Sequence, residues 1–132
     1  MALTNLTKGA VVDSEGGSAT TNLAQGLAKA WSHYSGTGTT FNNSLNLSSA
    51  VDNTTGDYSA NFSSSFSDAY YSATNGSAES TTGRGTFLTG SDFSHTTSSY
   101  RHQYGLSSNA AGSGLIDSDI NNVQITVHGD LA

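Results

Sequence analysis

The sequence predicts an all-β fold, a small antiparallel β-sandwich or barrel-like module. Apolar and polar residues alternate in several separate stretches, as they do in half-buried strands, and Pro is absent, so Gly, Asn, Asp and Ser must shape every bend. A chain of 132 residues holds one such domain. We expect residues 26–132 to form this β-domain. Residues 1–25 are expected to form a flexible N-terminal arm, because residues 2–22 include a polar, Gly-containing run without periodicity.

The clearest element is a hairpin over residues 45–66. Its two arms alternate apolar and polar residues, so their apolar side chains should project to one face. The connector, residues 52–57, suits a turn because Asp and Asn bond to nearby backbone groups and Gly56 adopts a positive φ without steric cost. The residues expected on this face are Leu45, Leu47 and Val51 on the first arm and Tyr58, Ala60, Phe62 and Phe66 on the second.

The segment before the hairpin has two interpretations. Leu23, Leu27 and Trp31 recur with the spacing of a short amphipathic helix, although Gly26 inside it costs ~1 kcal/mol relative to alanine. An extended segment would instead place Lys29, Trp31 and His33 on one face and Ala28, Ala30, Ser32 and Tyr34 on the other. The following Gly36-Thr37-Gly38-Thr39 predicts a turn between strands; it lacks the third glycine of a dinucleotide-binding loop.

Three patterns predict strands in the second half of the chain. Residues 69–73 lead to Asn75-Gly76, a strong two-residue hairpin signal. Tyr70 and Tyr71 should point to opposite faces of that strand. Residues 77–99 support no structural prediction. The remaining two strands are expected to present Tyr100, His102 and Tyr104, and Val123, Ile125 and Val127, each set on one face.

Composition excludes several function classes. The net charge is −6 and the chain has only four Lys and Arg residues, which argues against binding to a nucleic-acid backbone. No apolar run is long enough to span a membrane, and no Cys is present to form a disulfide or a thiolate metal site. The larger apolar residues are few, so a lone subunit would have a thin core. We therefore expect an oligomer, which buries more surface.

No catalytic or metal-binding motif stands out, and we expect no enzyme activity and no cofactor. The residues Asp117-Ser118-Asp119-Ile120-Asn121 begin like a calcium loop, but Asn122 replaces the glycine that an EF-hand needs at its sixth position and His128 replaces the bidentate Glu. A looser calcium site stays open against a solvated loop. The histidines, His33, His95, His102 and His128, lack metal-ligand spacing, although a trimer axis could gather one from each subunit.

Three aromatic residues are candidates for contact with a ligand. Trp31 is expected to be a packing anchor, and the alternative is a sugar-stacking platform, which requires a neighbouring polar rim. Tyr70 and Tyr104 are the other two candidates for contact with a host-surface glycan.

Several of these segments together resemble a β-rich virion structural and tail-fibre module of tailed marine and cyanobacterial bacteriophages. The resemblance is dense over residues 26–71 and returns at the last strand, residues 123–130. It departs from the family pattern at Ser32-His33, where an apolar-polar pair is usual, and at Thr54, where Gly is common. The matching residues are Gly-Leu-Ala-Lys-Ala-Trp at 26–31, Gly-Thr-Gly-Thr at 36–39, Leu-Asn-Leu-Ser-Ser at 45–49, Asp-Asn at 52–53, Thr-Gly-Asp-Tyr at 55–58 and Phe62.

The resemblance implies a non-enzymatic, homotrimeric subunit of the phage tail or tail fibre, located in the virion and assembled in the bacterial cytoplasm. The alternatives are a capsid decoration or head-fibre protein and a module that binds host-surface carbohydrate. Partners would be further copies and other virion proteins, reached through residues 2–22, with no nucleic acid and no membrane. The residues expected to pack within or between subunits are Trp31, Leu45, Leu47, Val51, Tyr58, Phe62, Val123, Ile125 and Val127.

Overall fold

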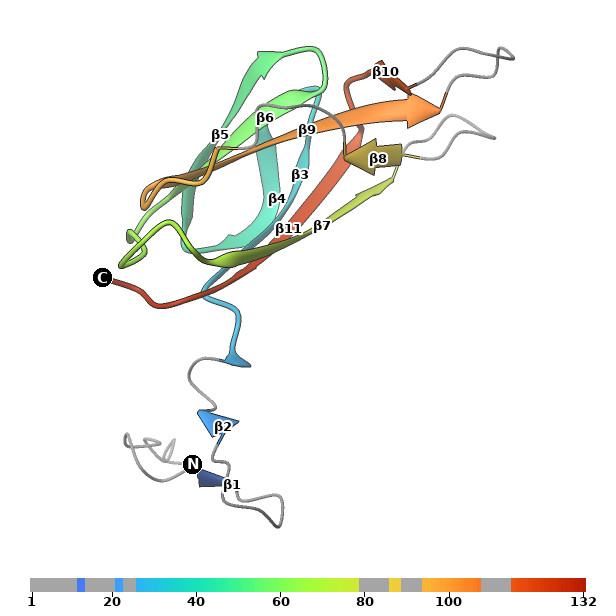
Figure 1. Cartoon of the computed structure of the whole chain (residues 1–132). Helices are drawn as coiled ribbons and strands as arrows, with labels where there is room; N and C mark the ends of the chain where they lie inside the picture. The colour runs from blue at the N-terminus through green and yellow to red at the C-terminus, as the bar shows by residue number, and fades with distance from the viewer. Residues whose placement is uncertain (1–11, 14–20, 23–25, 79–85, 89–93, 108–114) are drawn as a thin grey trace, which may run out of the picture.

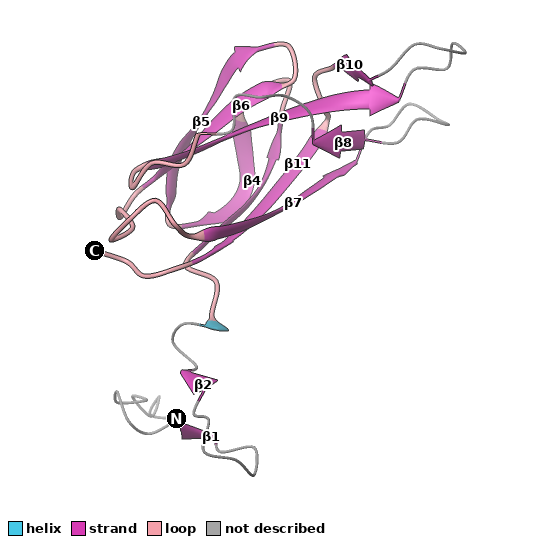
Figure 2. Ribbon diagram, viewed as in Figure 1, coloured by secondary structure: helices cyan, strands magenta, loops and turns pink. Residues whose placement is uncertain are grey.

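The structure, a computed structural model, describes residues 12–13, 21–22, 26–78, 86–88, 94–107 and 115–132. The predicted all-β fold is confirmed: apart from a short helical piece at Gly26, strands and their connecting loops make up the described chain (Figure 1, Figure 2). No helix among these residues is long and apolar enough to cross a membrane. The strands are β1 (Val12–Asp13), β2 (Thr21–Asn22), β3 (Ala30–Ser35), β4 (Thr40–Leu45), β5 (Leu47–Thr54), β6 (Asp57–Phe62), β7 (Ser72–Ala78), β8 (Thr86–Leu88), β9 (Ser99–Ser107), β10 (Leu115–Asp117) and β11 (Asn122–His128).

Two antiparallel sheets face each other, so the sandwich is the correct one of the two predicted architectures. One, which we call the Trp31 sheet, has the order β4-β3-β11-β7. The other, the Arg101 sheet, has the order β10-β9-β6-β5, with β8 also paired to β9. β1 and β2 pair with each other. The rest of residues 1–25, apart from β1 and β2, lies outside the described residues, and the flexible arm stays a prediction.

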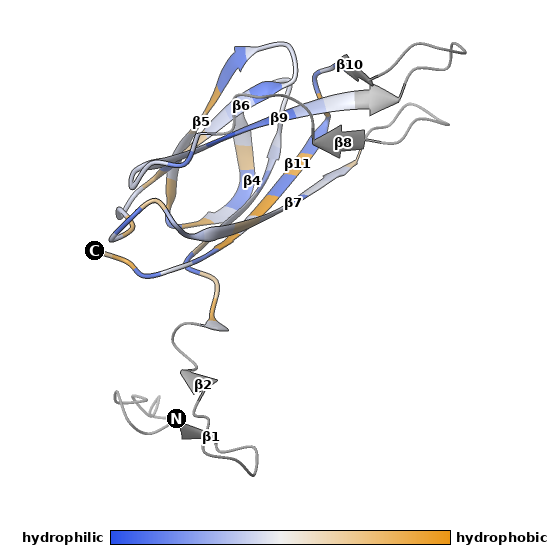
Figure 3. Cartoon of the chain, in the orientation of Figure 1, coloured by the Kyte–Doolittle hydropathy of each residue, from blue (hydrophilic) through white to orange (hydrophobic). Residues whose placement is uncertain are grey.

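Alternation along the strands places the core between the sheets. In β11, Val123, Ile125 and Val127 are buried, as predicted, while the polar residues between them are more accessible. Hydrophobic and hydrophilic residues alternate along this strand (Figure 3). In β3 the buried face is Ala30, Ser32 and Tyr34, so the extended interpretation is correct from Ala30 onward and a helix that reaches Trp31 is wrong. Gly26 is helical, and residues 23–25 lie outside the described residues. Trp31 therefore lies on the outer face of its sheet. The remaining predicted strand faces, Tyr58, Ala60 and Phe62 in β6 and Tyr100, His102 and Tyr104 in β9, are also buried.

The central hairpin forms between β5 and β6, and its turn is where the sequence placed it. Gly56 has φ +72°, a conformation that side-chain-bearing residues rarely adopt. The turn between β3 and β4 over residues 36–39 is confirmed as well.

The predicted apolar face of the first hairpin arm is wrong for two of its three residues. Leu45 and Leu47 belong to different strands, separated by Asn46 at φ 55°. A β-bulge between Leu47 and Ser49 then reverses the alternation, because one extra residue moves every following side chain to the other face. As a result Leu47 is buried, whereas Leu45 is 47% and Val51 41% exposed.

The Asn75-Gly76 hairpin is also wrong, because both residues lie inside β7. The Asn75 side chain points into the sandwich and donates to the Tyr100 hydroxyl at 2.6 Å. Gly76 pairs with Gln124, and a Cβ on Gly76 would lie 3.2 Å from the Gln124 Oε1 atom. Here glycine leaves room for a neighbouring side chain instead of making a turn.

Candidate functional site

Among the residues that the structure describes, half of those in the hydrophobic core are aromatic, and most of the aromatics are tyrosines. Five of the six tyrosines are buried, and each buried hydroxyl has a hydrogen-bond partner. The chain thus fills its interior with side chains that carry a large apolar ring and one polar group. The buried tyrosines are Tyr34, Tyr58, Tyr71, Tyr100 and Tyr104.

His102 lies at the centre of this aromatic core and is fully buried. Its Nε2 atom is 2.8 Å from the Tyr34 hydroxyl, which comes from the opposite sheet. Its ring stacks on Tyr100, with the centroids 5.0 Å apart and the planes 22° from parallel. The Tyr34–His102 hydrogen bond therefore links the two sheets through the core.

The electrostatics of this position keep both groups uncharged. Burial lowers the pKa of His102 from 6.5 to about 4, although the Tyr100 backbone and the Asp57 carboxylate oppose that effect. Burial also raises the pKa of Tyr34 well above its usual value, and the neighbouring tyrosines add to the rise. A neutral, buried imidazole of this kind holds a hydrogen bond but is too weak a base to accept protons near neutral pH.

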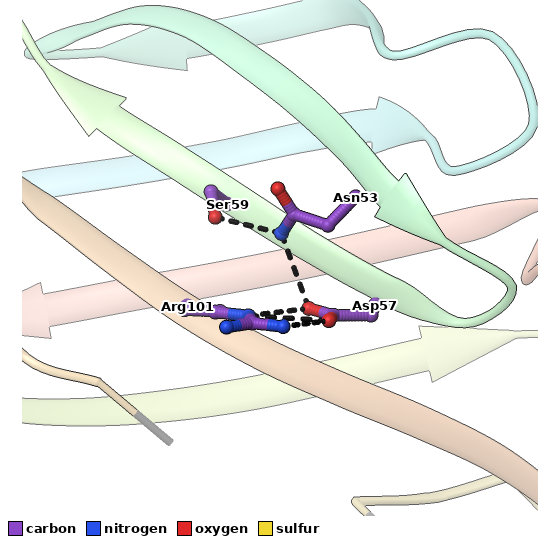
Figure 4. Close-up of polar contacts among 4 residues, drawn as sticks. All are labelled: Asn53, Asp57, Ser59 and Arg101. Atoms are coloured by element: carbon purple, nitrogen blue, oxygen red, sulfur yellow. Dashed lines mark hydrogen bonds and ion pairs between the residues drawn. The ribbon is translucent and has the colours of Figure 1, made fainter. Parts of the chain in front are cut away.

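A second polar cluster fixes the β5–β6 hairpin to β9 (Figure 4). The Arg101 guanidinium grips the Asp57 carboxylate with two nitrogens: Nε lies 3.0 and 3.1 Å from the two oxygens, and Nη2 bonds Oδ2. The Asn53 amide donates to Asp57 at 3.1 Å and to Ser59 at 2.9 Å. These hydrogen bonds, chiefly that from Arg101, lower the pKa of Asp57. An ionised carboxylate bonded in this way holds neighbouring strands together and is a poor general acid.

The segment that begins like a calcium loop makes hydrogen bonds to the β5–β6 hairpin of the same chain. The Asp119 carboxylate accepts from the Gly56 backbone N–H at 2.8 Å and from the Tyr58 hydroxyl at 3.3 Å. The backbone N–H of Ile120 donates to the same Tyr58 oxygen at 3.0 Å. Asp119 thus holds the hairpin turn in place. Within the part of the chain that the structure describes, no three His, Cys, Asp or Glu side chains gather as a metal site would require.

The outer face of the Trp31 sheet combines an aromatic side chain with neutral polar groups. Trp31 is half-buried and lies directly opposite Leu45 on β4 and Thr126 on β11. His33, two residues along β3, lies between Asn43 and Gln124 in the same way. The His33 Nε2 atom is 3.1 Å from the Asn122 Oδ1, which fixes the imidazole on this face.

The residues predicted from the sequence divide between the interior and the surface. Trp31, Leu45 and Val51 are accessible, and Tyr70 is 94% exposed. Tyr104 is 1% exposed and its hydroxyl donates to the Gly76 carbonyl, so it offers no contact to a ligand at the surface. The other predicted packing residues, Leu47, Tyr58, Phe62, Val123, Ile125 and Val127, lie in the core of the subunit itself.

Sequence reasoning missed the two polar clusters. The alternation of Tyr100, His102 and Tyr104 identified the buried face of β9, but nothing in the sequence links His102 to Tyr34 across the sandwich. Asp57 was recognised only as part of a turn. Its position diagonal to Arg101 follows from the β6–β9 register, which pairs Ser59 with Arg101 and Asp57 with Gln103.

Comparisons of the chain with protein-family models, with curated proteins and with solved structures gave no match.

Proposed function

We propose that the chain is a non-enzymatic structural subunit of a bacteriophage virion, a homotrimer in the tail or tail-fibre apparatus. The likeness of residues 26–71 and 123–130 to a phage module supports the virion assignment.

The observation that carries the proposal is a pair of exposed apolar residues on two edge strands. β4 ends the Trp31 sheet and β5 ends the Arg101 sheet, and the two strands follow each other directly in the chain. Leu45 at the end of β4 is 47% exposed and Val51 on β5 is 41% exposed. Accessible leucine and valine at adjacent sheet edges are suited to packing against another copy.

The edges themselves favour contact through side chains over extension of a sheet. The β3–β4 pair has a register shift between His33 and Tyr34, and β5 has two shifts against β6. Such bulges interrupt the regular row of backbone donors and acceptors that a further strand would need. Subunits would therefore meet through Leu45 and Val51 instead of by extending a sheet.

Sedimentation of the full chain tests the proposal directly. We expect a species of three times 13.5 kDa, and conversion to monomer on Leu45→Glu or Val51→Glu, since each places a charge in an apolar contact. Ser72→Glu on β7, the opposite edge of the Trp31 sheet, is the matched control and should stay trimeric. A folded wild-type monomer at every concentration would contradict the proposal.

The position in the particle needs a separate experiment. An antibody against the chain should label the tail of purified particles in electron micrographs. Labelling of the head instead would assign the chain to capsid decoration, and crosslinks from residues 2–22 to the major capsid protein would agree with that outcome.

A further inference from the structure

The outer face of the Trp31 sheet has a charge pattern that differs from the rest of the molecule. The chain has a net charge of −6, yet no Asp or Glu occupies an outward position on β3, β4, β7 or β11. The outward residues are amides, hydroxyls, imidazoles and small side chains around Trp31 and Leu45. Within these four strands the face therefore carries no charged side chain, and the nearest cation along β3 is Lys29, one residue before the strand.

The register places neutral hydrogen-bonding groups around the indole. Thr126 is directly opposite Trp31, at a usual Cβ separation of about 5 Å, and Asn43 and Gln124 are diagonal to it at about 7–8 Å. Asn43 and Gln124 are exposed, and His33 is held in place by Asn122. These spacings match a six-membered sugar ring that stacks on the indole and reaches the surrounding groups with its hydroxyls.

A second copy of the chain is a poorer occupant of the same face. Stable homodimers need about 800 Å² per partner with an interface that is about two-thirds apolar. Only two large apolar side chains, Trp31 and Leu45, are available on the four strands, and Leu45 lies at the edge. One aromatic residue surrounded by amides and hydroxyls suits a polyhydroxylated ligand better, because each of its hydroxyls needs a polar partner once it leaves water.

We propose that this face binds a neutral saccharide, with a pyranose ring stacked on Trp31 and hydroxyls bonded by Thr126, Asn43 and Gln124. The proposed subunit contact borders this site, because Leu45 lies directly opposite Trp31, whereas Val51 is on β5 of the other sheet. Saccharide binding by monomeric Val51→Glu therefore tests the site separately from the subunit contact. Binding of one ring on an open face should be weak, with Kd on the order of millimolar, and should strengthen in oligosaccharides or in a trimer.

The experiment uses the fact that Trp31 is the one tryptophan of the chain, so that its fluorescence reports this face alone. The full chain is titrated with glucose, galactose, mannose and N-acetylglucosamine, with their neutral oligomers, and with a polysaccharide sulfate. We expect a saturable change in emission with at least one neutral sugar and none with the sulfate.

Variants separate a binding role from a packing role. Thr126→Val and Asn43→Ala should each weaken binding by about three- to tenfold, the effect of one neutral hydrogen bond, and Trp31→Ala should abolish the heat of binding in calorimetry. Thr54→Val, at an exposed position on β5 of the other sheet, is the matched control and should bind normally. Circular dichroism confirms that each variant is folded.

Three results would overturn the inference. These are the absence of any saturable change with the neutral sugars, unchanged binding in folded Thr126→Val and Asn43→Ala, and an emission change that follows protein concentration instead of sugar concentration. The last result would show that the face is a contact between copies.

Discussion

Acidification should destabilise the protein through His102 before the Asp57 carboxylate is affected. In the folded chain the pKa of His102 is about 4, against 6.5 in the absence of burial. Above pH 6.5 the imidazole is neutral in both states and the full stability is present. As the pH falls from 6.5 to 4, only the unfolded chain takes up the proton, so the free energy of unfolding decreases.

The magnitude follows from the two pKa values. Their difference corresponds to a loss of about 3 kcal/mol, with a limiting slope of about 1.4 kcal/mol per pH unit. The groups that face the imidazole are Tyr34, Tyr58, Tyr100 and Tyr104, which stay neutral in this range. The Asp57 carboxylate has a lowered pKa, so its contribution is present above pH 3.8 and is lost only below that value. The window between pH 6.5 and 4 therefore separates the effect of His102 from that of Asp57.

Urea unfolding at fixed protein concentration, followed by Trp31 fluorescence at pH 7, 5.5 and 4.5, measures this slope. In His102→Phe, which keeps an aromatic ring in the core, the slope should disappear while the stability at pH 7 falls moderately because the Tyr34 hydroxyl loses its partner. His128→Gln keeps His102 and therefore its slope. The reasoning fails if the wild type shows no slope, or if His102→Phe keeps it.

Three further substitutions test the polar links, each by the urea midpoint at pH 7. Tyr34→Phe should lower the free energy of unfolding by about 1 kcal/mol. In a double-mutant cycle this loss should be largely absent in the His102→Phe background. Additive losses would refute the inter-sheet hydrogen bond. Arg101→Ala should lower the free energy of unfolding by about 1–3 kcal/mol, because it leaves the buried Asp57 carboxylate without its main hydrogen-bond donor. A loss as small as that of a surface substitution would show that the Asp57–Arg101 pair does not stabilise the fold. Gly56→Ala should cost more than about 1 kcal/mol because φ is +72° and a Cβ would lie 2.9 Å from the Ser118 backbone; a neutral effect would show that the turn relaxes freely.

How far the sequence predicts the structure depends on whether the signal is local. Alternation in β6, β9 and β11 identified the buried faces because a strand with one side in the core must place every second side chain there. The turn at Gly56 was predictable for the same local reason. Two predictions failed because strand pairing outweighed the local sequence signal. A bulge after Leu47 turns Val51 outward. Asn75-Gly76 lies within β7 because pairing with β11 continues through both residues.

The two polar clusters could not be predicted because they depend on contacts distant in sequence. Tyr34 and His102 are 68 positions apart, and Asp57 and Arg101 are 44 apart. Each pair forms only when the order of strands and their register are fixed. The proposed saccharide face also depends on strand order. The sequence identified Trp31 as a candidate, but only the pairing of β3 with β4 and β11 brings Asn43 and Thr126 beside it.

The tyrosine-rich core changes the argument for a trimer. The scarcity of leucine, isoleucine and valine suggested that a lone subunit would be poorly packed and would associate to complete its core. Five buried tyrosines with bonded hydroxyls supply that core within one subunit. Association would then serve assembly and not folding, so Leu45→Glu should yield a monomer whose urea midpoint at pH 7 stays close to that of a wild-type sample dissociated by dilution. A monomer that unfolds spontaneously would instead restore the view that the subunits complete each other's cores.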